Sequence, residues 1–396
     1  MSDGNAAAIL DYSIASLYPS NWRWAVRDLL TQPAEALRFF VPTPGSVAAW
    51  KELFKRAEVY VLVSQVPRLI GVPKSPPLPL LELLEHAYAL GPFPALWAVE
   101  GLGKAYGDSS WEQGKVPHDL LTGPQAAKLP AASLLMMHAG IGLSIATRLL
   151  SPFAPLAAAA PRQQLARALA ETVALCRQNS RPGYVGAALE SIGLVTRSFH
   201  PGLVQDAGRM LAEADEAVAG FYWHGVGRAM FFLVASFLPC GSSDRRGFEM
   251  AASEAPDERA RDSAVAGMAW AVTLVNQQQP EVVAELLWRD RALLAGDPAF
   301  VNGLASSIIM RYDTTPDAPF TASFCDYRPP GAEAAGLWGE VVANPCRRAL
   351  EEWYPALKAA DRLGEVFRYQ PLPQLIQQRR SGPDGWGRRS KRGRGR

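Results

Sequence analysis

The chain has 396 residues, 48% of them hydrophobic and 20% charged. It can therefore bury a large core and form one large domain or two to three domains of ordinary size. The net charge of +2 is unevenly distributed: the last eighteen residues carry +7, and the rest, with 32 Lys/Arg and 37 Asp/Glu, carries −5. The four cysteines are far apart and form no CxxC pair, which argues against a structural zinc site or a disulfide scaffold and favours a reducing compartment.

The N-terminal sequence, MSDGNAAAILDYSIASLYPS, lacks the basic and apolar regions of a signal peptide. No run of 18 consecutive apolar residues occurs. The nearest, at 133–150, is interrupted by His138 and Arg148, and its composition favours a buried helix. We therefore expect a cytoplasmic protein without a transmembrane segment.

Helical spacing dominates the rest of the chain. The best strand signal, EVYVLVSQV at 58–66, is equally compatible with a buried helix. Apolar residues that return every three to four positions predict amphipathic helices over 162–178 and 203–221. Clusters of proline and glycine separate such segments, at 71–79, 151–155, 180–183, 239–244, 313–319 and 328–331. The expected fold class is all-α.

A small-residue motif recurs along the chain, most clearly as EGLG at 100–103 and HGVG at 224–227. The anchoring glycines are Gly103, Gly142, Gly186, Gly227, Gly267 and Gly303, at intervals of 39, 44, 41, 40 and 36 residues. Polar, helix-patterned segments lie between the motifs, most visibly at 162–178, 203–219 and 254–262. A period near 40 with two helices per unit is typical of an α-solenoid-like array of helical pairs.

The glycines have a physical reason in such an array. Each destabilises a helix by about 0.8–1 kcal/mol relative to alanine. Close approach of two helix backbones offsets this, so we interpret Gly225 and Gly227 as close-packing positions.

This pattern divides the chain into four predicted parts: an N-terminal helical extension at 1–78, a helical repeat domain at 79–312, a C-terminal helical segment at 313–378 and a disordered basic tail at 379–396. The tail is either a solvated terminus or an electrostatic tether to nucleic acid, an anionic membrane or an acidic protein, because clustered cations displace counterions from phosphates.

Two kinds of chemistry lack support. Neither GLG at 101–103 nor GVG at 225–227 continues into GxGxxG after a predicted strand or into the Lys-Ser/Thr of a phosphate-binding loop. No GxSxG elbow occurs, and no cysteine has a histidine near it in sequence, so nothing indicates nucleophilic catalysis.

A polar residue accompanies several of the glycine motifs. Glu100, His138, Glu190 and His224 hold similar places before their glycines, and Arg228 follows Gly227. If the units stack in register, these side chains line one surface as a carboxylate–imidazole set, which suits metal binding or proton transfer. The alternative is that each is hydrogen-bonded to neighbouring backbone in a packed helix layer. They are the candidate catalytic residues, with Arg228 pairing with a glutamate or receiving an anionic ligand; the cofactor stays open, and no metal is indicated.

Aromatic side chains are frequent in the motif segments, for example Trp97, Trp223 and Trp270. At helical spacing they are most often core residues, and the alternative is an aromatic pocket for a hydrophobic ligand.

The series EGLG, HAGIGLSIA, WHGVGRAMFF and DSAVAGMAWAVTLV resembles the family of uncharacterised proteins found with enediyne antibiotic biosynthesis clusters. The resemblance covers roughly residues 80–280 and is carried by Glu100, His224, Gly225, Gly227 and Arg228. It implies a role beside secondary-metabolite biosynthesis and a site near His224, and it supplies no mechanism.

Two functions follow as hypotheses. The first is a helical scaffold or accessory protein that binds a partner protein through the surface of the repeats. The second is an accessory biosynthetic enzyme or a hydrophobic-ligand-binding protein with a Glu/His/Arg pocket around His224. Whether the chain is an enzyme stays open, and the two hypotheses differ in whether the candidate residues meet in space.

Overall fold

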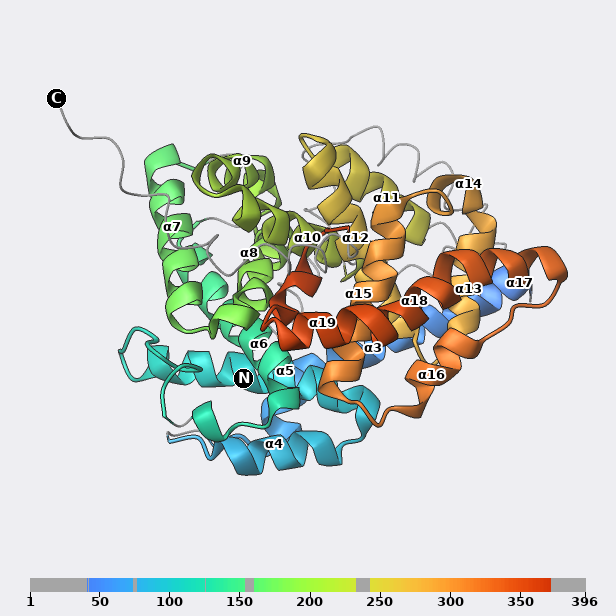
Figure 1. The fold of residues 1–396 in the computed structure, drawn as a ribbon. Coiled ribbons are helices and arrows are strands. Elements are labelled where there is room, and N and C mark those ends of the chain that lie inside the picture. The colour runs from blue at the N-terminus through green and yellow to red at the C-terminus, as the bar shows by residue number, and fades with distance from the viewer. Residues whose placement is uncertain are drawn as a thin grey trace.

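The structure is a computed structural model that describes residues 41, 43–73, 77–124, 126–153, 160–232 and 243–371 (Figure 1). Within these ranges every regular element is helical and no strand occurs, which confirms the all-α class. The tail predicted at 379–396 lies outside the described residues. The solenoid-like period of about 40 residues stays a prediction.

Six helices are buried along most of their length, and we call them the inner helices. They are α5 (Pro92–Glu112), α6 (Ala131–Leu150), α8 (Val185–Phe199), α10 (Glu216–Phe232), α12 (Glu258–Asn276) and α15 (Pro298–Thr314). Each packs against the next in chain order, from α5 to α15. All six glycine motifs lie in these helices or at their start.

Helices with one exposed face precede the first inner helix or lie between the inner helices in sequence. They are α4 (Leu80–Ala89), α7 (Arg162–Gln178), α9 (Val204–Ala214), α11 (Ser243–Glu254), α13 (Pro280–Arg289) and α14 (Arg291–Leu294). The helix predicted at 162–178 is confirmed, because α7 has these bounds.

The bounds predicted at 203–219 and 254–262 are wrong, because each segment contains a helix boundary. Asp215 separates α9 from α10 and its carboxylate accepts a hydrogen bond from the backbone N–H of Ala217 at 3.0 Å. Asp257 is the N-cap of α12 and binds the N–H of Ala260 at 2.9 Å. Such caps satisfy the free N–H groups of a helix start, and the apolar spacing conceals them.

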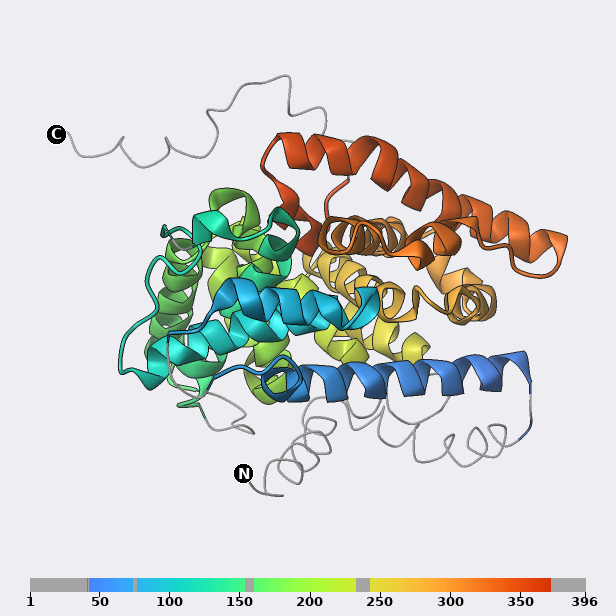
Figure 2. The same ribbon diagram turned by 90° about the horizontal axis from the view of Figure 1, so that it is seen from below.

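Two long helical runs lie on opposite edges of the molecule (Figure 2). One is α3 (Pro44–Leu69), which packs against α5, α12 and α13. It contains residues 58–66, so that segment is a helix and not a strand. The other run consists of α17 (Ala332–Trp338), η5 (Gly339–Ala343), α18 (Asn344–Arg348), η6 (Ala349–Trp353) and α19 (Tyr354–Ala359).

The two π-helical turns of this run, η5 and η6, have a local cause. The turn η5 ends two residues before Pro345, and η6 ends two residues before Pro355. Proline donates no backbone hydrogen bond, and its ring clashes with the carbonyl four residues earlier. A wider turn accommodates both effects. The remaining short elements are α16 (Pro319–Asp326), η1 (Ala126–Lys128), η2 (Pro182–Tyr184), η3 (Pro201–Leu203) and η7 (Leu363–Phe367).

Glycines set the spacing of the inner helices. A Cβ atom at Gly225 would lie 2.0 Å from the carbonyl oxygen of Glu190 in α8, and one at Gly227 would lie 1.8 Å from that of Ala264 in α12. Residues two apart point about 200° apart around a helix, so a GxG pair gives one small residue to each of two neighbours. This confirms the close-packing interpretation, and the helical conformation of 221–232 rules out a phosphate loop there.

Among the described helices, α6 is the one that is long and apolar enough to span a membrane, and 78% of its apolar window is buried inside the protein. Residues 133–150 thus form a buried helix, as their composition predicts.

Candidate functional site

Three of the candidate residues lie at close helix crossings. In each crossing the Cβ of a glycine would lie about 2 Å from the carbonyl oxygen of a polar residue on the next helix: Gly140 from Glu100 (2.0 Å), Gly225 from Glu190 (2.0 Å) and Gly267 from His224 (1.9 Å). These polar residues therefore lie at close helix crossings, as the apolar Ala264 does at the crossing of Gly227. This geometry explains why the sequence pairs them with glycines.

Arg228 joins two of these residues. Its Nη2 donates to both carboxylate oxygens of Glu100, at 2.7 and 2.9 Å, and its Nη1 donates to Glu190 Oε2 at 3.2 Å. The three side chains come from α10, α5 and α8 and are 0–3% exposed. Hydrogen bonds between ionised partners are shorter and stronger than neutral ones, so this guanidinium ties three helices together.

His224 lies beside the same carboxylates. Its Nδ1 is 3.5 Å from Glu190 Oε1, and its ring contacts Trp270 and Phe367 edge-on, with centroids 5.9 and 6.1 Å away. By the usual distance and angle criteria, neither ring nitrogen of His224 has a hydrogen-bond partner in the described part of the chain. Glu190 Oε1 has none there either. Nearly all buried polar atoms in native proteins are bonded, and these three are among the buried side-chain atoms of the described residues that have no such bond. We call Glu100, Glu190, His224 and Arg228 the central cluster.

Burial and charge set the protonation of the central cluster. Burial raises the pKa of Glu100, and Arg228 opposes this. Burial lowers the pKa of His224, and Glu190 offsets it only in part. Burial lowers the pKa of Arg228, but the carboxylates of Glu100 and Glu190 raise it by more, so the pKa of Arg228 lies above its usual value. At neutral pH the cluster therefore holds a charged arginine beside a neutral imidazole.

His138 lies apart from the central cluster. Its Nδ1 donates to the carbonyl of Leu134 at 2.6 Å, and its Nε2 accepts from the N–H of Arg181 at 3.0 Å. Its ring stacks on Tyr184 with centroids 5.1 Å apart. Both nitrogens are thus occupied by backbone, which is the alternative that the sequence left open for every candidate residue.

His138 predicts a pH dependence of stability. Burial lowers its pKa to about 3, from 6.5 in an exposed histidine. The stabilisation from a neutral buried ring is complete above pH 6.5 and is lost as the pH falls towards 3. Between pH 6.5 and 4.5 we expect the free energy of unfolding to fall more steeply in the wild type than in His138→Leu, by up to about 1.4 kcal/mol per pH unit. Urea denaturation across this range measures the difference.

His118 provides the control, because its side chain is 64% exposed. The substitution His118→Leu should leave the slope of the wild type unchanged. Equal slopes in His138→Leu and the wild type would show that His138 is not buried in neutral form.

A second buried charged cluster was not predicted from the sequence. Arg56 Nη2 lies 3.1 Å from Asp244 and 3.3 Å from Glu52, and Asn276 donates to Glu52 at 3.0 Å. Burial raises the pKa of Glu52 well above its usual value. The pairing of Glu52 with Arg56 could have been predicted from the sequence, because the two residues are four positions apart on the buried face of α3 that also carries Val59. The contact to Asp244, 188 residues away, has no such signal.

The element η7 covers the central cluster. Phe367 at its end packs against His224 and also against Trp270, with centroids 5.6 Å apart. Glycine holds η7 close to α8, since a Cβ at Gly186 would lie 2.3 Å from the carbonyl oxygen of Gly364. The next two residues, Arg368 and Tyr369, line a groove of about 670 Å³ that also borders α9, α10 and α12. This groove thus begins one residue from the ring that covers His224.

No group of three or more His, Cys, Asp or Glu side chains in the described ranges is placed to hold a metal ion. In the central cluster, the guanidinium of Arg228 occupies the position between the two carboxylates.

Comparison with models of protein families, with curated proteins and with solved structures gives no match for the chain. The resemblance to the enediyne-cluster family therefore stays a prediction. The geometry of the central cluster is the basis for a functional proposal.

Proposed function

We propose that the chain binds a small molecule at the central cluster and that Glu190 and His224 transfer a proton there. One observation carries this proposal: inside a closed core, the Nε2 of His224 has no hydrogen-bond partner among the described residues, and its Nδ1 meets Glu190 Oε1 only at 3.5 Å. The equally buried His138 has both nitrogens bonded. Since buried polar atoms need partners, the free atoms near His224 suit the polar group of another molecule.

The roles follow from the contacts. Glu190 Oε1 faces His224 Nδ1 and, after a small approach from 3.5 Å, would orient the ring by accepting its N–H. Nε2 would then be the free base that takes a proton from the ligand. Arg228 acts as a positioning residue, because it holds both carboxylates. Trp270 and Phe367 form an aromatic wall, which favours a ligand with an apolar body and one polar group.

Diethylpyrocarbonate tests the proposal without knowledge of the substrate, because it modifies neutral imidazole nitrogens that small molecules reach. We expect His224 to be modified at least about tenfold faster than His138, since bonded nitrogens are poor nucleophiles and free ones are good. Mass spectrometry of peptides measures both rates in the same sample. The exposed His118 should react fastest.

Two variants sharpen this test. Phe367→Ala should accelerate the modification of His224, because it removes the ring that covers it, and should leave His118 unchanged. His224→Gln should abolish the modified peptide. If His224 reacts as slowly as His138, both in the wild type and in Phe367→Ala, small molecules do not reach the central cluster and the proposal is wrong.

The scaffold hypothesis remains the second candidate, because α3 presents a stripe of exposed apolar side chains. Val47, Phe54 and Val61 follow at seven-residue intervals and are 46%, 67% and 60% exposed. This spacing places them on one side of a helix. Contiguous exposed apolar surface favours an interaction with a partner protein. A cytoplasmic location and a role beside secondary-metabolite biosynthesis belong to either proposal.

A further inference from the structure

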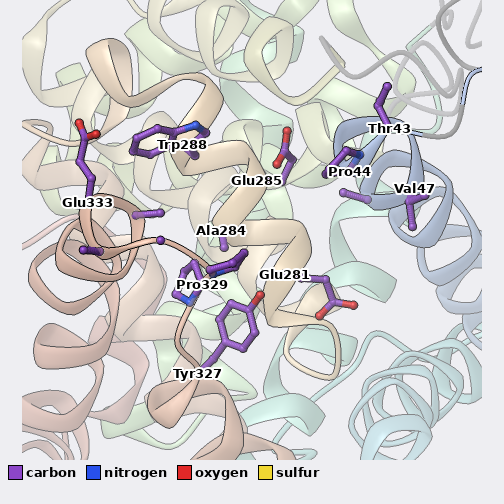
Figure 3. Close-up of a pocket in the computed structure, with 15 residues that line it drawn as sticks. Thr43, Pro44, Val47, Glu281, Ala284, Glu285, Trp288, Tyr327, Pro329 and Glu333 are labelled. Atoms are coloured by element: carbon purple, nitrogen blue, oxygen red, sulfur yellow. The ribbon is translucent and has the colours of Figure 1, made fainter.

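A groove of about 760 Å³ lies between the start of α3, helix α13 and the loop before α17 (Figure 3). Most of its lining is apolar or aromatic, with Val47, Ala284, Trp288, Tyr327, Pro329 and Pro330. It is separate from the groove that borders η7, with which it shares no residue. The apolar floor gives a docking segment surface to bury.

Carboxylates rim this groove, and no lysine or arginine lines it. Glu281 and Glu285 stand on the same face of α13 as Trp288, since residues four and seven apart share a helix face. Glu281 pairs with Lys51 beside the groove. Glu285 and Glu333 form no ion pair with any described residue. The rim therefore offers two carboxylates that have no ion pair within the described part of the chain, next to an aromatic floor.

Trp288 also stacks on a cation that does not line the groove. The guanidinium of Arg291 lies 4.5 Å from the ring centroid of Trp288, which shows that a cation stacks on this indole. A segment that combines arginines with an aromatic side chain would match both the rim and the floor.

We infer that the groove docks the C-terminal segment 379–396 of the same chain. This segment, RRSGPDGWGRRSKRGRGR, holds eight Lys/Arg, one Asp and Trp386, and its charge of +7 complements a body of −5. Its arginines pair with Glu285 and Glu333, and Trp386 packs on the apolar floor. This goes beyond the proposed function, because it concerns a surface distinct from the central cluster.

The segment between the last described residue and Trp386 sets how far Trp386 can reach. The described chain ends at Pro371, and the side chain of Asn302 donates to the carbonyl of Gln370 just before it. Roughly 15 residues then lead to Trp386, which span up to about 50 Å when extended and about 20 Å on average as a flexible chain. A tethered segment has an effective concentration of order millimolar. Docking within one chain therefore competes well with partners in solution.

Photo-cross-linking in the full chain tests the inference. Benzoylphenylalanine in place of Trp386 keeps an aromatic ring and should cross-link to residues 284–288 and 327–334, as peptide mass spectrometry would show. The double substitution Glu285→Gln and Glu333→Gln should lower this yield roughly threefold to tenfold, as expected from two exposed ion pairs. Glu340→Gln, an exposed carboxylate of η5 outside the groove, should leave the yield unchanged.

A mixture of light and isotopically heavy protein shows which chain supplies the tail. Cross-links within light or within heavy chains support the inference, and light–heavy cross-links overturn it. Cross-links spread over the surface, or a yield indifferent to the Glu285/Glu333 substitutions, also overturn it. The reactivity of His224 does not depend on the tail, so this failure and a failure of the proposed function are distinguishable.

Discussion

Gly227→Ala is expected to lower the free energy of unfolding by about 3 kcal/mol, or to prevent folding altogether. The added Cβ would lie 1.8 Å from the carbonyl oxygen of Ala264, so α10 and α12 must separate to admit it. Alanine favours a helix over glycine by only about 1 kcal/mol, which does not offset the clash. Urea denaturation of the two proteins measures the difference.

Gly336→Ala is the matched control, because Gly336 also lies inside a helix and a Cβ there meets no atom within 4 Å. It should raise the free energy of unfolding by about 0.5–1 kcal/mol through helix propensity alone. Close packing by Gly227 is refuted if both alanine variants are stabilised by similar amounts.

Arg228→Met is expected to lower the free energy of unfolding by about 3–5 kcal/mol at pH 7.5. The substitution leaves Glu100 and Glu190 buried without their cation. Burial already raises the pKa of Glu100, and loss of the arginine raises it further. A buried carboxylate with a raised pKa destabilises the fold above that pKa and is relieved by protonation below it. The deficit of Arg228→Met should therefore shrink as the pH falls from 8 to 5.

Arg348→Met serves as the comparison, because Arg348 and its partner Glu352 are 53% and 47% exposed. Its effect should be small, because water and salt screen an exposed ion pair. A loss for Arg228→Met that is equally small, or that does not change with pH, would contradict a buried ion-pair cluster.

The sequence predicted what depends on local spacing. The all-α class, the bounds of α7 and the packing role of Gly225 and Gly227 follow from helical periodicity and glycine chemistry. The boundary at Asp215 was missed because side-chain capping depends on one local hydrogen bond, which apolar spacing does not reveal.

Which residues form the central cluster could be established only from the structure. Glu100 and His224 directly precede a glycine, whereas His138 stands two positions before Gly140. This offset alone does not decide membership of the cluster, because Glu190 stands three positions before Gly193 and joins it, whereas His138 binds backbone. The pairing of Arg228 with Glu100 depends on how the inner helices turn across 128 residues, which spacing alone does not encode.

A double-mutant cycle between Arg228 and Glu100 tests most directly whether the inner helices bring the candidate residues into one buried cluster. The free energies of unfolding of the wild type, Arg228→Met, Glu100→Gln and the double variant give the coupling. We predict a coupling of at least about 2 kcal/mol, because Glu100→Gln removes one of the two charges that Arg228→Met leaves uncompensated. Additive effects within about 0.5 kcal/mol would show that the two side chains do not meet, and the central cluster would not exist.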